Sequence, residues 1–112
     1  MNDREKYYTT LRQSDFEKRI LTEKDCLNAI IFINDLFASY VIYDSIIEEV
    51  AEELDEFCTF YRINTEVSTD LTKRYGIGNI PTLLLFNQGQ IVDHLYGIHP
   101  KSYLRNYIRE HL

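Results

Sequence analysis

A chain of 112 residues is long enough for one domain with its own hydrophobic core, and 45% of its residues are hydrophobic. The formal net charge of −6 excludes nucleic acid and anionic membranes as expected partners, because neither attracts an acidic protein. No apolar run reaches the roughly 20 residues of a membrane span, and Met1–Arg12 lacks the apolar centre of a secretory signal. We therefore expect a cytoplasmic protein with a single domain, residues 1–112.

Short patterns of polar and apolar residues predict the first elements. Tyr7–Leu11 is rich in Tyr and Thr, which favours a short strand. Ser14 and Glu17 have the spacing of a capping box, which predicts a short helix over about residues 15–21. The nearly continuous apolar run Cys26–Ile33 is typical of a strand that is buried on both faces.

A long helix is predicted from about Ser39 to Phe57, with the Ser39 side chain as its N-terminal cap. Apolar residues recur at three- and four-residue steps and predict its inward face: Ile42, Ile46, Ile47, Val50, Leu54 and Phe57. Acidic residues cover the remainder: Glu48, Glu49, Glu52, Glu53, Asp55 and Glu56. We interpret this acidic cluster as a solvated face, and a docking surface for a basic partner is the alternative.

The next elements are a strand and a short helix. The alternating residues Thr59–Ile63 predict the strand. Ser68 can cap a helix that ends at Tyr75, and Gly76 suits the left-handed backbone that commonly follows a helix.

A hairpin and a last helix follow. Thr82–Phe86 and Ile91–Leu95 flank the turn residues 87–90 and predict two antiparallel strands. Pro100 can open a helix through Leu112. Its expected inward residues are Tyr103, Leu104, Tyr107 and Ile108. The alternation of strands and helices predicts an α/β fold with a central mixed β-sheet flanked by helices.

One stretch of the chain resembles the thioredoxin family. Residues Tyr75–Phe86 (YGIGNIPTLLLF), followed by Gly89, are similar to the family pattern Tyr-Gly-Ile-x-x-Ile-Pro-Thr-Leu-x-x-Phe-x-x-Gly. Further matches outside this stretch are Asn64, Gly97, Lys101 and Leu104. The similarity extends without gaps from about Ala29 to Leu112. The resemblance implies a thioredoxin fold with a cis Ile80–Pro81 bond before the fourth strand, at a turn that is either purely structural or part of a binding groove.

The family's reactive centre has different residues in this chain. The positions of its Trp-Cys-Gly-Pro-Cys motif correspond to Leu36, Phe37, Ala38, Ser39 and Tyr40. Neither Phe37 nor Tyr40 can attack a disulfide, because that step requires a thiolate. The family's buried Asp, which assists proton transfer, falls on Ile31. The resemblance therefore implies a member of the family without its usual dithiol chemistry, and an enzymatic role is not expected.

The two remaining cysteines offer another possibility. Cys26 and Cys58 form no C-x-x-C motif, and no histidine lies near either of them in the sequence. This spacing predicts neither a metal site nor a cofactor, and in the cytoplasm we expect two inert, buried thiols. In the expected topology both cysteines lie at one end of neighbouring parallel strands, opposite the Ile80–Pro81 turn. An oxidoreductase that uses Cys26 and Cys58 is therefore the alternative function.

We interpret the former active-site groove as a surface that binds another protein. The resemblance places these residues around it: Leu36, Phe37, Tyr40, Ile80, Pro81, Tyr96, Gly97 and Ile98. Aromatic side chains beside exposed backbone groups suit an extended peptide segment, so we predict a redox-inactive chaperone, assembly factor or adaptor. Two further alternatives stay open: the aromatic residues only cover the edge of the core, or they form a permanent subunit interface.

Overall fold

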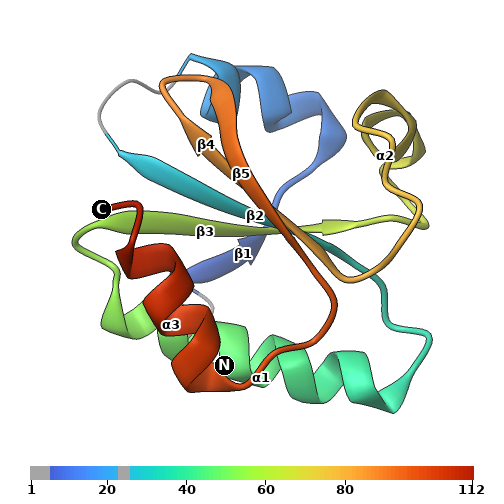
Figure 1. Ribbon diagram of the computed structural model, residues 1–112. Helices are drawn as coiled ribbons and strands as arrows, with labels where there is room; N and C mark the ends of the chain where they lie inside the picture. Colours follow the sequence, from blue (N-terminus) through green and yellow to red (C-terminus); the bar gives the residue numbers. More distant parts are fainter. Residues whose placement is uncertain (1–5, 23–25) are drawn as a thin grey trace.

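A five-stranded sheet forms the centre of the computed structural model, which describes residues 6–22 and 26–112 (Figure 1). Its strands, in spatial order, are β1 (Tyr8–Thr10), β3 (Cys58–Asn64), β2 (Leu27–Ile33), β4 (Thr82–Asn87) and β5 (Gln90–Tyr96). The first three strands are parallel, β4 is antiparallel to β2, and β5 is antiparallel to β4. The predicted mixed sheet is confirmed. The prediction that Met1–Arg12 is not a secretory signal falls partly on residues 1–5, which lie outside the described residues.

Helical segments cover both faces of the sheet (Figure 1). On one face lie α1 (Ala38–Glu53) and α3 (Lys101–Arg109), which contact each other. The other face carries the 3-10 turn η2 (Gln13–Asp15), the π-helical turn η3 (Glu17–Leu21) and α2 (Thr69–Arg74). Within the described ranges, no helix is long and apolar enough to cross a bilayer.

All seven residues of β2 are buried, as expected for a strand that is covered on both faces. Its side chains alternate between the two layers. Leu27, Ala29, Ile31 and Ile33 belong to the core under α1 and α3. Ile30 and Phe32 belong to the core under η2, η3 and α2. The strand therefore joins two apolar layers, and its ends lie beside the loops that reach the surface.

The buried stripe of α1 differs from the prediction. Ile42 and Phe57 are exposed, whereas Tyr43 is buried. The observed stripe is Tyr43, Ile47, Val50, Ala51 and Leu54, which also follows steps of three and four residues. Burying Tyr43 removes a large aromatic area from water, and a hydrogen bond with the backbone of His99 gives its hydroxyl a partner. Burial raises the pKa of Tyr43 to about 12.

Two predicted serine caps do not form. Ser14 lies within η2, whose N-cap is Arg12, and no side-chain capping bond occurs at η2 or η3. The capping box with Glu17 was therefore wrong, because this segment turns as a 3-10 and then a π-helix. Ser39 lies inside α1, which begins one residue earlier than expected and has Phe37 as its N-cap.

The third serine, Ser68, is the N-cap of α2 but makes no capping bond with its side chain. Gln13 supplies the acceptor instead: its Oε1 accepts the backbone amides of Asp70 and Leu71, at 3.0 and 3.2 Å. A residue from η2 therefore satisfies the exposed amides at the start of α2. At the other end of α2, Gly76 has a φ of 63°, the left-handed backbone that its position predicted.

The inward face of α3 is narrower than predicted. Leu104 and Ile108 are fully buried and Tyr107 is partly buried, but Tyr103 is exposed. The ring of Tyr103 stacks on His99, with 4.7 Å between the ring centroids. A helix of nine residues presents only about one row of side chains to the sheet, so the tyrosine beside that row stays in solvent.

Salt bridges join α1 to α3. Part of the acidic face of α1, which was predicted to be solvated, therefore pairs with basic residues of α3. Glu53 of α1 accepts two hydrogen bonds from Arg105, at 2.6 and 3.1 Å, and lies 2.8 Å from Lys101 Nζ. Glu49 also pairs with Lys101, at 3.3 Å. The hydrogen bonds from Arg105 and Lys101 lower the pKa of Glu53 from 4.5 to about 2.

This carboxylate predicts a specific acid sensitivity. Because the pKa is lower in the folded state, Glu53 stabilises the fold above pH 4.5, and this contribution is lost as the pH falls toward about 2. Glu53→Gln should therefore show a smaller loss of stability between these pH values than the wild type. Urea unfolding at a series of pH values measures the difference, and parallel curves for the two proteins would contradict the prediction.

Candidate functional site

The candidate groove begins where β2 passes into α1. Leu36 is exposed, and Phe37, the N-cap of α1, is 58% exposed on extended backbone. Tyr40 follows and is partly buried, with its ring edge-on to that of Phe37 at a centroid distance of 5.4 Å and an angle of 87°. We predicted that these aromatic residues lie side by side near the surface, and in the structure their rings are in contact there.

The turn before β4 lies against this aromatic pair. The Ile80–Pro81 peptide bond is cis. The Tyr40 hydroxyl donates a hydrogen bond to the carbonyl oxygen of Ile80, at 3.3 Å. Pro81 is buried and Ile80 is partly buried. The structure therefore brings Phe37, Tyr40 and Ile80 together although they come from two distant parts of the chain.

The end of β5 closes the other side of the turn. The Gly97 amide donates to the carbonyl oxygen of Pro81, at 2.9 Å. Gly97 has a φ of 87°, which a residue with a side chain adopts only with strain. Its neighbours Tyr96 and Ile98 are exposed, and the ring of Tyr96 contacts that of His94.

We expected the backbone carbonyls of the turn to be free acceptors, but they already accept hydrogen bonds. Three consecutive carbonyl oxygens accept hydrogen bonds from within the molecule. Asn79 accepts from the Thr82 hydroxyl, Ile80 from Tyr40, and Pro81 from the Gly97 amide. Because a carbonyl oxygen has two lone pairs, a peptide amide that pairs with one of these carbonyls either replaces the internal donor or shares the oxygen with it.

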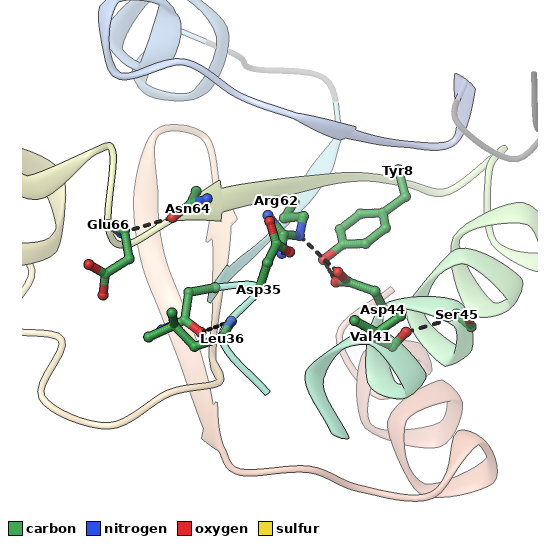
Figure 2. A network of polar contacts seen from close by, with 10 residues as sticks. Tyr8, Asp35, Leu36, Val41, Asp44, Ser45, Arg62, Asn64 and Glu66 are labelled. Atoms are coloured by element: carbon green, nitrogen blue, oxygen red, sulfur yellow. Dashed lines mark hydrogen bonds and ion pairs between the residues drawn. The ribbon is translucent and has the colours of Figure 1, made fainter. Parts of the chain in front are cut away.

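Sequence reasoning missed a network of polar side chains beside the groove (Figure 2). Arg62 Nε donates to Asp44 Oδ2 at 2.9 Å, and its Nη2 pairs with Asp35. The Tyr8 hydroxyl donates to the other oxygen of Asp44, also at 2.9 Å. Burial, together with the negative charge of Asp44, raises the pKa of Tyr8 well above its ordinary value. The signal in the sequence was an arginine within a predicted strand, because a buried guanidinium requires carboxylate partners.

This network holds the loop that presents the aromatic residues. Asp35 lies in the loop between β2 and α1, and Arg62 holds it against β3. The next residue, Leu36, donates its amide to Asn34 Oδ1 at 3.0 Å. A pocket of about 540 Å³ opens beside the loop, and its lining includes Asp35, Arg62 and Asn64. The loop before Phe37 is therefore held by two polar contacts.

The two cysteines lie at the opposite end of the sheet from the turn. Leu27 is in register with both Cys58 and Asn87, which marks the end of β4 far from Pro81. Cys58 is buried in the core under α1 and α3, and burial, with a smaller effect of Cys26, raises the pKa of its thiol to about 12. Cys26 is only partly buried, which differs from the prediction, and both thiols are free.

The sulfur atoms of the cysteines have different surroundings. Cys26 Sγ lies 3.5 Å from Thr59 Oγ1. Thr59 follows Cys58 on β3, and consecutive side chains of a strand point to opposite faces of the sheet. The two cysteines therefore lie at the same end of neighbouring parallel strands, as expected, but Cys26 contacts β3 on the side away from the Cys58 side chain. In the part of the chain that the structure describes, no group of three His, Cys, Asp or Glu residues could hold a metal ion.

Comparison with known proteins assigns the chain to a family. The Thioredoxin family model matches residues 8–110. The chain belongs to the thioredoxin family. It is 34% identical over 67 residues to Thioredoxin 1 of Synechococcus elongatus and to a thioredoxin of Pyropia yezoensis, matches that cover 60% of this chain and 63% of each relative. It is 28% identical over 82 residues to a thioredoxin of Chlorobaculum thiosulfatiphilum, across 70% of this chain and 76% of the relative. The chain thus spans less than two thirds of the first two relatives.

The two carboxylates that pair with Arg62, those of Asp44 and Asp35, provide a matched comparison for a stability measurement. The side chain of Asp44 is 19% exposed and that of Asp35 is 69% exposed, whereas that of Arg62 is 11% exposed. Asp44→Asn should lower the free energy of unfolding by about 2 kcal/mol, because it weakens a charged bond that is shielded from water. Asp35→Asn should lower it by less than about 1 kcal/mol. Urea unfolding measures both values, and equal losses would contradict this ranking.

Proposed function

We propose that this thioredoxin-family chain binds an extended segment of another protein and does not exchange disulfides at its groove. The observation that carries the proposal is the edge-on pair of Phe37, which is exposed, and Tyr40, which is partly buried, where β2 passes into α1. Residues 34–44 contain no cysteine, and disulfide exchange requires a thiolate. The chemistry that remains at the groove is apolar contact and backbone hydrogen bonding.

The position of Phe37 supports a role as an anchor for a partner. A phenylalanine that is 58% exposed leaves a large apolar area in water, and a partner that covers this area gains the free energy of its burial. The Asp35–Arg62 pair and the Leu36–Asn34 bond hold the loop, so less conformational freedom is lost on binding. A cytoplasmic location, and a protein partner rather than nucleic acid or a membrane, belong to the same proposal.

Phe37→Ala should weaken the binding of extended apolar peptides by about thirtyfold, because truncating an aromatic anchor often costs 2 kcal/mol or more. An array of short peptides identifies the strongest binder of the wild type, and fluorescence anisotropy then measures its Kd. The melting temperature should stay nearly unchanged, because most of the Phe37 side chain is in solvent.

Phe57 is a matched control for this variant. It is 55% exposed, close to the value for Phe37, but lies beyond the other end of α1. Phe57→Ala should leave the Kd of the same peptide unchanged. Equal losses of affinity in the two variants would indicate non-specific apolar attraction. A large fall in melting temperature for Phe37→Ala, with an unchanged Kd, would mean that Phe37 only covers the core.

Thiol–disulfide exchange by Cys26 and Cys58 is the second candidate function. The similar proteins are named thioredoxins, and these names favour redox chemistry over a purely binding role. The two cysteines also lie at the same end of the neighbouring strands β2 and β3, where Leu27 pairs with Cys58 and Cys26 contacts Thr59. Against this function, burial raises the pKa of Cys58 to about 12, which leaves little thiolate near neutral pH.

A reduction assay separates the two functions. With dithiothreitol as the reductant, the wild type should not accelerate the reduction of insulin disulfides above the uncatalysed rate. In the native protein at pH 8, iodoacetamide should modify Cys26, which is partly exposed, well before Cys58, which is buried and has a raised pKa. Catalysis that disappears in Cys26→Ser or Cys58→Ser would establish the oxidoreductase and overturn the redox-inactive proposal.

A further inference from the structure

The hydrogen bonds at the Ile80–Pro81 turn differ in how firmly they are held. The bond from Thr82 to Asn79 is local, and the bond from Gly97 to Pro81 joins two backbone atoms. The bond from Tyr40 to Ile80 instead joins a side chain of α1 to the turn. Its length of 3.3 Å exceeds the usual 2.5–3.0 Å of O–H···O bonds. Of the three donors, Tyr40 is therefore the one that a ligand replaces most easily.

The ring of Tyr40 is held in place by contacts that do not involve its hydroxyl. It packs against the core under α1 and α3 and lies edge-on to Phe37. Removing the hydroxyl therefore leaves the ring in position and removes one donor from the carbonyl of Ile80. The hydroxyl and the ring can thus be tested separately.

We propose that the Tyr40 hydroxyl is a latch that covers the carbonyl of Ile80 until an extended peptide displaces it. This inference rests on the proposed function, because it concerns the same groove. An extended peptide gains affinity from backbone hydrogen bonds when its amides find free acceptors. In the wild type, Tyr40 already occupies one lone pair of the Ile80 oxygen. A peptide amide must displace the hydroxyl or share the oxygen with it, so the net gain is smaller. Without the hydroxyl, the peptide amide meets an unoccupied carbonyl and the whole gain remains.

The test compares the wild type with Tyr40→Phe, using the array peptide that the wild type binds most strongly. Tyr40→Phe should lower the Kd about fivefold, the size expected when one hydrogen bond of ordinary strength is no longer offset. Copies of the peptide that are N-methylated at one amide at a time identify the amide that pairs with Ile80. At that amide, N-methylation should abolish the difference between the two proteins. Tyr103→Phe, which removes the hydroxyl of an exposed tyrosine on α3, should leave the Kd unchanged.

A measurement on the free protein tests the latch without any peptide. The ¹³C chemical shift of the Ile80 carbonyl should change in Tyr40→Phe and not in Tyr103→Phe. An unchanged shift would overturn the latch and leave the proposed function intact. An equal or higher Kd for Tyr40→Phe would also overturn the latch, while binding by the wild type would still uphold the proposed function. Absence of peptide binding by both proteins would overturn both.

Discussion

The complete burial of β2 is the constraint on which the rest of the structure depends. All residues of this strand except Asn28 are apolar and they line both of its faces, so helical layers must cover both sides of the sheet. A strand whose two faces are both mainly apolar gives little information about its own register, because a slip by one residue still leaves apolar side chains on both faces. Its neighbours supply that information. Arg62 and Asn64 of β3 lie opposite Ile31 and Ile33, and their polar groups require the carboxyl end of the sheet, where loops and solvent are near.

The sequence predicted the order of elements because each depends on local patterns. Apolar runs, turn residues and the spacing around Pro81 are all read within a few residues. The errors arose where the decisive partner is distant in sequence. Gln13 satisfies the start of α2 from η2, which no local capping rule finds. The stripe of α1 was misplaced because Tyr43 was not counted as apolar, although its ring fills the core and its hydroxyl reaches the backbone of His99.

The candidate site was predictable in position and not in hydrogen bonding. A gap-free resemblance placed Phe37 and Tyr40 at the β2–α1 junction and Ile80 at the turn, and their proximity follows from the fold. The occupied carbonyl of Ile80 depends on one side chain reaching across to another element, and no pattern in either segment encodes that contact. The same holds for Arg62, whose partners come from the β2–α1 loop and from α1.

The position of negative charge distinguishes this chain from the family pattern. Where the pattern has a buried Asp, this chain has Ile31, which is in register with Arg62. An arginine that is so nearly buried still requires carboxylates, and Asp44 of α1 and Asp35 of the loop supply them. Both carboxylates pair with the same guanidinium, which stays charged near neutral pH. They therefore join α1 and the β2–α1 loop to β3, next to the residues Phe37 and Tyr40.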